Sequence, residues 1–401
     1  MKIVFFSLIL NNHQANVADE LWEQTGHQYR FVELANLKAE HRKGDTRNYD
    51  TCPYLLRAWK SEANWQKAME LARTAECCVF SGVQALPFQK ERMKLGLLSF
   101  DMSERWLKQG IKNILSPAIS KMFWAYWFGG WKNKPLYKLC CSAFAAGDHY
   151  RLSMYKGKCY KWGYFTSLPE VDSNYSSGFD TNVEASPDVS TSNITPLMWC
   201  SRYLMWKHPE LPILMAHNLK KRGYNFVLDM FGSGAYEEQS KKLVGKLGVE
   251  DVVRFRGTMS NDALMKEMRK HDIFLFTSDC NEGWGAVSNE CMANGCVLVA
   301  SDAIGSVPYL VRNGENGMVF MSASAKTSFE NPDKTALDDL SGKVAWLLDH
   351  KDGMKKIQHK AACTMQELWS PKRAAQNLLK LIDALKNGRE SLIEEGPCSK
   401  A

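Results

Sequence analysis

The stretch Glu282-Gly-Trp-Gly-Ala-Val-Ser-Asn-Glu290 decides the fold class of this 401-residue chain. An apolar run at 273–276 precedes it, a helix-compatible run at 286–295 overlaps it, and a second apolar run occupies 297–300. This order of strand, loop, helix and strand is typical of a parallel α/β sheet, which binds ligands at the carboxyl ends of its strands. We therefore expect the glycine-bearing loop to lie in a ligand site.

The residues of this loop suit a nucleotide-like ligand. Gly283 and Gly285 allow the backbone to approach closely, and the helix that follows would point its free N–H groups at a diphosphate. Glu282 and Glu290 bracket the loop, and ionised carboxylates accept hydrogen bonds from the hydroxyls of a sugar and of a ribose. Taken alone, the two glutamates favour the simpler interpretation of a solvated helix start, and the surrounding motifs are needed to indicate a site.

Further motifs follow in a fixed order on both sides of this stretch. They are Trp199–Arg202 with Lys207, Met230–Gly234, Val253–Gly257, Ser278 with Glu282–Gly285, Glu290–Gly295, Gly305–Pro308 and Val311–Phe320. In this order and spacing they resemble the retaining glycosyltransferases of family four (glycosyl transferases group 1, bacterial surface-polysaccharide type). The resemblance covers roughly 194–320 and is weak over the first half of the chain.

The resemblance implies the α/β GT-B fold, in which two Rossmann-like doubly wound domains face each other across a cleft. A length of 401 residues with 45% apolar residues also favours two globular domains. The expected segments are an acceptor-binding domain at 1–165, a polar linker at 166–193, a donor-binding domain at 194–370, a helix crossing back at 371–388 and a mobile tail at 389–401.

The resemblance also implies the roles of individual residues in the second half. Departure of a nucleoside diphosphate requires stabilisation of negative charge, and the chain has no Asp-x-Asp with which to bind a metal ion. We expect fixed cations to do this instead, without a metal or another cofactor. The predicted catalytic residues are Glu282, Arg202 and Lys207, and the predicted donor-binding residues are Gly283, Trp284, Gly285, Glu290, Arg256 and Gly257.

The first half offers weaker candidates for contact with an acceptor. His13 follows the first apolar run, and Asp101, Glu104 and Arg105 follow a later one. Relatives have a histidine near this second position, whereas this chain has none, so that role is not transferred. Each candidate is also an ordinary helix-cap or surface residue. A long helix is predicted over 54–71.

The segment 121–134 places six aromatic residues between lysines. Aromatic side chains flanked by basic residues suit the headgroup region of a membrane, so the segment predicts contact with its inner face. The alternative is an aromatic helix buried in the core of the domain.

Composition narrows the location and the partners. The formal charge of +7 favours anionic ligands or anionic membrane surfaces, and no motif indicates nucleic acid. The twelve cysteines form no Cys-x-x-Cys, which favours reduced thiols in the cytoplasm. The first ten residues predict a buried strand rather than a signal peptide, and no apolar run is long enough to span a membrane.

The sequence thus predicts a glycosyltransferase that moves a sugar from a nucleotide-diphosphate sugar to a hydroxyl of a glycan or lipid-linked acceptor, with retention of configuration. The protein would be cytoplasmic or peripheral at the inner face of the membrane. Two alternatives remain open: a nucleotide-sugar-binding protein without turnover, and a GT-B epimerase or phosphorylase. A dinucleotide-dependent oxidoreductase is disfavoured because Gly232-Ser-Gly234 lacks the third glycine of that fingerprint.

Overall fold

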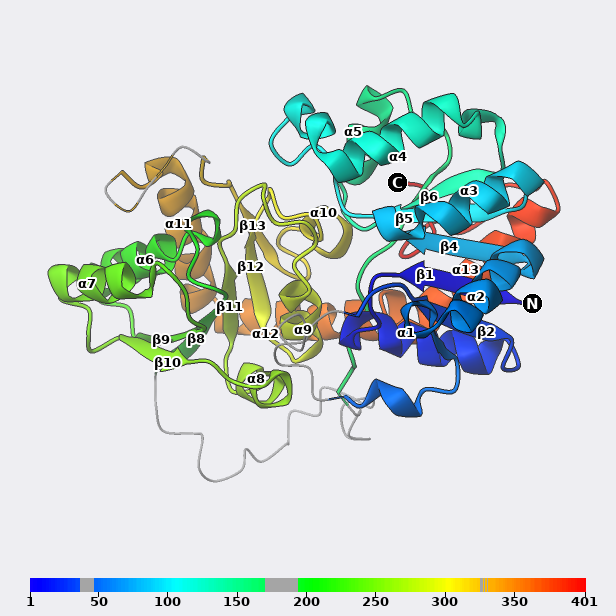
Figure 1. Ribbon diagram of the computed structural model, residues 1–401. Helices are drawn as coiled ribbons and strands as arrows, with labels where there is room; N and C mark the ends of the chain where they lie inside the picture. The colour runs from blue at the N-terminus through cyan, green and yellow to red at the C-terminus, as the bar shows by residue number, and fades with distance from the viewer. Residues whose placement is uncertain (37–46, 170–193, 325–326, 328, 330) are drawn as a thin grey trace.

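The computed structural model describes residues 1–36, 47–169, 194–324, 327, 329 and 331–401, and its core is built on two separate parallel sheets (Figure 1). The first sheet has seven strands in the order β3-β2-β1-β4-β5-β6-β7, and every pair is parallel. Its strands are β1 (Ile3–Ser7), β2 (Tyr29–Glu33), β3 (Leu55–Arg57), β4 (Cys77–Ser81), β5 (Ser99–Ser103), β6 (Leu136–Cys140) and β7 (Cys159–Lys161).

Helices cover both faces of this sheet because successive strand residues point to opposite sides. In β1, Ile3 and Phe5 pack on the side of α1, whereas Val4 and Phe6 pack on the side of α2 and α3. The helices of this domain are α1 (Asn12–Gln24), α2 (Glu62–Thr74), α3 (Leu86–Leu95), α4 (Pro117–Phe128) and α5 (Ala145–Arg151).

The second sheet has six parallel strands in the order β10-β9-β8-β11-β12-β13. They are β8 (Thr195–Cys200), β9 (Phe226–Phe231), β10 (Val253–Gly257), β11 (Ile273–Phe276), β12 (Val297–Ser301) and β13 (Met318–Phe320). The accompanying helices are α6 (Glu210–Lys221), α7 (Glu237–Leu247), α8 (Asn261–Met268), α9 (Val287–Ala293), α10 (Val307–Leu310) and α11 (Lys334–Asp349). The predicted α/β class with two Rossmann-like domains is confirmed.

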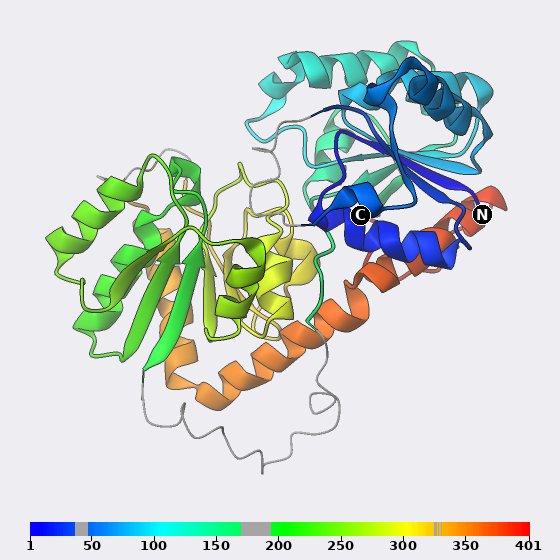
Figure 2. The ribbon, with the colours of Figure 1, turned by 60° about the horizontal axis from the view of Figure 1, so that its bottom comes forward.

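The chain returns to the first domain through two helices that run along one side of the molecule (Figure 2). The first is α12 (Lys351–Cys363), which continues into a π-helical turn at Thr364–Leu368. The second is α13 (Pro371–Lys386), whose buried residues pack in the same apolar cluster as those of α1. This crossing links the second sheet back to the first.

The residues after α13 contradict the prediction of a mobile tail at 389–401. Cys398 is fully buried, and its backbone N–H donates to the carbonyl of Lys161. The N–H of Lys161 donates in turn to the carbonyl of Ser399, and Lys400 forms an antiparallel bridge with Tyr160. The tail therefore covers the open edge of β7, because an uncovered edge strand has unpaired backbone groups.

Two further predictions meet different outcomes. The long helix predicted over 54–71 is wrong at its start, because β3 occupies 55–57 and α2 begins only at Glu62. Most of the predicted linker, 170–193, lies outside the described residues. In the part of the chain that is described, every helix is too short or too polar to traverse a bilayer.

Candidate active site

The predicted cations and carboxylates of the second domain lie where its parallel strands end. Lys207 follows β8 and Glu282 follows β11, two neighbouring strands. The ammonium of Lys207 forms an ion pair with the carboxylate of Glu282, and both side chains are nearly buried. Burial lowers the pKa of Lys207, although the charge of Glu282 opposes this shift. The structure therefore brings these two predicted catalytic residues into direct contact.

A group of buried residues that the sequence did not reveal holds these two loops together. The hydroxyl of Thr277 donates to the carbonyl of Lys207 over 2.7 Å, and the N–H of Asp279 donates to the carbonyl of Trp206 over 3.0 Å. His208 Nδ1 lies 2.7 Å from Glu210, and its Nε2 lies 3.7 Å from Asp279. These contacts fix the backbone on either side of Lys207.

The charge of His208 follows from this setting. Burial lowers the pKa of His208, but its close contacts with the carboxylates of Asp279 and Glu210 outweigh burial and raise it to about 9. The imidazolium therefore compensates two buried carboxylates at neutral pH. No sequence motif indicates this group, because its members become neighbours only when β8 and β11 pair.

The loop after β11 also contacts the first domain at Gly283. A Cβ atom at Gly283 would lie 1.7 Å from Glu104 Oε2, so any larger residue here would displace the Glu104 carboxylate. A Cβ atom at Gly305 would lie 1.8 Å from the carbonyl oxygen of Gly283 and 2.5 Å from Ser142 Oγ. The carbonyl of Gly305 accepts from the N–H of Ala143 over 2.8 Å. The ligand edges of the two sheets therefore face each other in contact.

Glu104 is thus the acceptor-side candidate that reaches the loop after β11. Its carboxylate accepts from the Tyr164 hydroxyl over 2.9 Å and pairs with Lys108 at 3.0 Å. The sulfhydryl of Cys280, just before Glu282, donates to the carbonyl of Lys108 over 3.7 Å. A carboxylate in this position is suited to accept a hydrogen bond from a hydroxyl that enters between the domains.

The side chain of Trp284 lies within an aromatic cluster at the domain interface. Its ring is 0% exposed, and its Nε1 donates to Asn289 Oδ1 over 2.8 Å. The ring centroids of Tyr164 and Trp369 lie 6.1 Å and 5.8 Å away. The ring is therefore a packing group, and contact of the donor with the backbone amides of 283–285 stays a prediction. A large apolar ring is buried wherever two surfaces offer it apolar contact.

Glu290, the second carboxylate of the motif, is buried on α9 with an unusual pKa. Burial raises its pKa to about 7, and a hydrogen bond with the Asn261 side chain, at the start of α8, partly opposes this shift. A buried carboxyl group with a pKa near 7 is typical of a functional site, where a ligand can supply the hydrogen bonds that burial has removed. Asn261 was not predicted, although it directly follows the loop after β10.

The remaining donor-side candidates lie at the same edge. Arg202 and Arg256 are exposed, and Arg256 Nε lies 3.9 Å from Asp229. Gly257 ends β10 with φ of 67°, and its carbonyl accepts from the N–H of Gly232 over 2.7 Å. Gly285 is also in the left-handed region, with φ of 81°. Of these residues, Arg202 lies close enough for its charge to lower the pKa of Lys207.

Two charged candidates of the first domain have structural partners. Asp101 is buried on β5, where it pairs with the fully buried Lys138 at 2.9 Å and accepts from the Tyr155 hydroxyl at 2.9 Å. This placement contradicts its predicted role in acceptor contact, because β5 turns the side chain into the core. Arg105 pairs with Asp148 at 3.3 Å. His13, at the start of α1, stacks on Tyr164 with ring centroids 5.8 Å apart.

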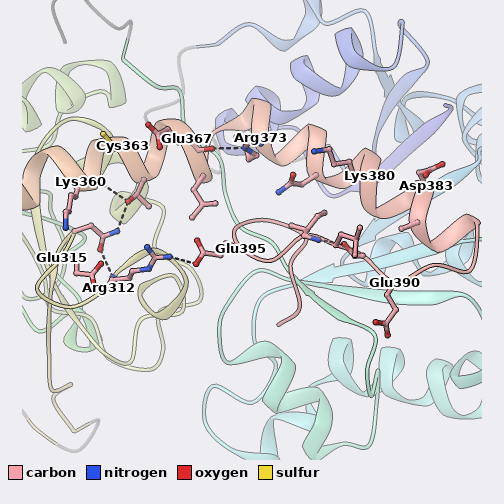
Figure 3. Close-up of a pocket in the computed structure, with 18 of the residues that line it drawn as sticks. Arg312, Glu315, Lys360, Cys363, Glu367, Arg373, Lys380, Asp383, Glu390 and Glu395 are labelled. Carbon is pink, nitrogen blue, oxygen red and sulfur yellow. Dashed lines mark hydrogen bonds and ion pairs between the residues drawn. The ribbon is translucent and has the colours of Figure 1, made fainter. Parts of the chain in front are cut away.

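A pocket of about 970 Å³ lies away from these residues, between the crossing helices, the loop after α10 and the tail (Figure 3). Its wall carries paired charges, such as Arg312 with Glu395 at 2.7 Å and Arg389 with Asp383 at 2.6 Å. Because acids and bases alternate along it, the pocket has no single electrostatic preference. It does not include any predicted site residue.

The described residues contain no group of three or more His, Cys, Asp or Glu side chains that could hold a metal ion. Metal independence of the reaction remains a prediction. The groups available for charge stabilisation at the candidate site are the side chains of Arg202 and Lys207 and the backbone of the loop after β11.

Comparison with known proteins identifies the second domain. Residues 197–343 match the family of glycosyl transferases group 1. The D-inositol 3-phosphate glycosyltransferase of Streptomyces bingchenggensis is 37% identical over 89 residues, which are 22% of this chain and 19% of that protein. The corresponding protein of Corynebacterium aurimucosum is 29% identical over 136 residues, 34% of this chain and 32% of that protein. The matches therefore span between a fifth and a third of these relatives.

Solved structures extend the likeness to the whole chain. HepE from Anabaena in complex with UDP has a TM-score of 0.66 at 14% identity, covering 96% of this chain and 100% of that one. A glycosyltransferase from Rickettsia africae has a TM-score of 0.64 at 13% identity, covering 96% and 98%. At such identities the likeness concerns the fold. The chain has the GT-B fold, and residues 197–343 of its second domain are similar to the glycosyl transferases group 1 family.

Proposed function

We propose that this protein is a glycosyltransferase that moves a hexose from a nucleotide-diphosphate sugar to a hydroxyl of a glycan or lipid-linked acceptor. The observation that carries the proposal is the contact between Lys207 and Glu282, with Glu290 on the next helix, at the ligand edge of a group 1 domain. The solved structure of HepE with UDP supports a uridine nucleotide as the first donor to test.

In the proposed reaction, Lys207 and Arg202 stabilise the negative charge that grows on the leaving diphosphate. In the structure the charge of Lys207 is balanced by Glu282. A bound diphosphate gives the ammonium a second anion, while Glu282 accepts hydrogen bonds from sugar hydroxyls. Glu290 holds the ribose. Fixed charges of this kind need no reorganisation during the reaction, which makes positioning the main contribution of the protein.

The acceptor hydroxyl enters from the side of the first domain, where Glu104 lies against Gly283. Transfer occurs with retention of configuration and without a metal ion, and we assign no protein nucleophile. All twelve cysteines are free, which supports a reducing compartment and hence the cytoplasmic side of a membrane, with a role in surface-polysaccharide synthesis.

The first experiment measures thermal stabilisation of the purified protein by UDP-, GDP- and ADP-sugars in the absence of metal. A ligand at ~100 times its dissociation constant adds ~2.7 kcal/mol to the folded state. We expect one nucleotide class to stabilise the wild type and to stabilise Glu290→Ala less. Glu250→Ala, an exposed glutamate of the same domain, serves as the matched control. No stabilisation by any donor would contradict the assignment of the site.

A second measurement separates turnover from binding. Incubation of the stabilising donor with glycan and lipid-linked acceptors should release nucleoside diphosphate and yield a product with the anomeric configuration of the donor, as read by NMR. Donor binding without product from a broad acceptor panel would favour the alternative of a nucleotide-sugar-binding protein. Inverted product would overturn the proposal of retention.

A further inference from the structure

The segment around α4 has a buried side and an exposed aromatic side. Met122 and Tyr126 of α4, and Trp131 just beyond it, are buried in the first domain. Trp124 and Phe128 are 51% and 81% exposed, although both are large and apolar. Burial in the core, one of the two alternatives that the sequence left open for 121–134, therefore holds for one side of α4 only, and the other side leaves two large apolar rings exposed.

The exposed side is a continuous stripe rather than two isolated residues. Lys121, Trp124 and Phe128 are three and four residues apart, which places them in one row along a helix. The rings of Trp124 and Phe128 stack with centroids 5.0 Å apart. Immediately before α4, in the 3₁₀ turn at Ile111–Leu115, Ile111 is 62% exposed and Leu115 is 80% exposed.

The surrounding charge has a single sign. Between Glu104 and Asp148 the sequence has no aspartate or glutamate, whereas it has six lysines and one arginine. Lys112, Lys121 and Lys132 are exposed. Within the described ranges, none of these three has a carboxylate partner, since the ion pair of this segment with Glu104 is made by Lys108. The positive charge near the aromatic stripe is therefore available to an outside partner.

We propose that the aromatic–lysine face, formed by Ile111, Lys112, Leu115, Lys121, Trp124 and Phe128, docks on the surface of a bilayer that contains anionic lipids. Exposed apolar rings gain free energy when they leave water, and rings of this size suit the boundary between headgroups and acyl chains. Each lysine near an anionic leaflet adds electrostatic attraction that falls off within a Debye length of the surface. Charge complementarity selects this occupant over a second copy, because a two-fold contact of this face would juxtapose like charges.

The aromatic–lysine face lies close in sequence to a residue that contacts the loop after β11. Lys108, a few residues before Ile111, contacts Cys280 in the donor loop through its carbonyl. In Figure 1, α4 lies on the outer side of the first domain, at the opposite end of the molecule from α8. Docking by this face would hold the acceptor side of the cleft near the bilayer. This orientation rests on the proposed function, whereas lipid binding itself does not.

The test is flotation of the full-length protein with vesicles, measured without donor or acceptor. We expect the wild type to float with phosphatidylglycerol-containing vesicles, weakly with pure phosphatidylcholine, and less as salt rises. Trp124→Ser with Phe128→Ser should lower the partition coefficient about tenfold or more, because two exposed rings no longer insert. Lys112→Glu with Lys121→Glu should produce a similar loss and remove most of the salt dependence.

Matched controls come from exposed residues of the second domain and its crossing helix. Trp346→Ser tests removal of an exposed tryptophan, and Lys355→Glu with Lys356→Glu tests reversal of exposed charge. Circular dichroism and thermal melting confirm that each variant is folded. Equal flotation of the wild type and the Trp124/Phe128 variant would overturn the proposal. So would a wild-type dimer in sedimentation that this variant makes monomeric, since the face would then bind a second copy.

Discussion

The two domains share one architecture but differ in how their ligand edges use charge. In the second domain, the charged residues after β8 and β11 converge, and Lys207 meets Glu282. In the first domain, Asp101 on β5 turns inward to Lys138, whereas Glu104, three residues further along, reaches the facing loop. Position at the carboxyl end of a strand therefore identifies a candidate, while the partner of the side chain decides its role.

The largest effect is expected from a substitution that removes the contact between Lys207 and Glu282 in the second domain. Lys207→Ala should lower the rate of sugar transfer about a thousandfold, because a fixed cation no longer stabilises charge on the departing diphosphate. The measurement is the steady-state rate at saturating donor, once the donor is known. Lys221→Ala, an exposed lysine at the end of α6, is the control. A rate within a few-fold of wild type would remove Lys207 from the proposed machinery.

The next largest effect distinguishes the buried Asp101 from the partly exposed Glu104 in the first domain. Asp101→Asn should lower the free energy of unfolding by about 3 kcal/mol, because it leaves the buried Lys138 without its counter-charge. Urea unfolding measures this loss. Glu104→Gln should change stability by less than about 1 kcal/mol, because its pair with Lys108 is partly exposed, and should instead lower turnover. The same stability loss in both variants would erase the distinction.

Glu290 gives a smaller effect that depends on pH. Its folded-state pKa of about 7 exceeds the ordinary value of 4.5, so the folded protein keeps a proton that the unfolded chain loses, and the fold is destabilised at this residue as pH rises between the two values. A ligand that needs the carboxylate should bind more weakly below the folded-state pKa, by up to about tenfold per pH unit.

Donor titrations by calorimetry from about pH 6 to about pH 8 would measure this slope. Glu290→Gln, which cannot ionise, should bind more weakly at high pH and show a flat profile. An identical slope in the wild type and this variant would assign the titration to another group.

The smallest effect concerns the tail. Arg312→Ala removes the exposed ion pair between the loop after α10 and Glu395, and should cost less than about 1 kcal/mol of unfolding free energy. Thermal melting at low and high salt would measure it, with Lys355→Ala as an exposed control. A larger loss would indicate that this contact holds the two domains together to a degree that surface ion pairs seldom do.

Prediction from sequence succeeded where the signal is local. The apolar run at 273–276, the glycines after it and the run at 297–300 became β11, the donor loop and β12 almost residue for residue. Prediction failed for β3, a short edge strand within a segment that has helical periodicity. This strand forms because it pairs with β2, and a local sequence pattern does not reveal such pairing. The buried group of Thr277, His208 and Asp279 was missed for the same reason.

The sequence by itself therefore determined the alternation of strand and helix, the position of the glycine-bearing loop after β11, and the places of Lys207, Glu282 and Glu290 relative to the strands. Only the tertiary structure decided that Trp284 packs between the domains and that Asp101 is a buried ion-pair partner. It also decided that the tail covers β7. Periodicity and turn chemistry are set by neighbours along the chain, whereas burial and charge pairing are set by residues that become neighbours only when distant segments pack.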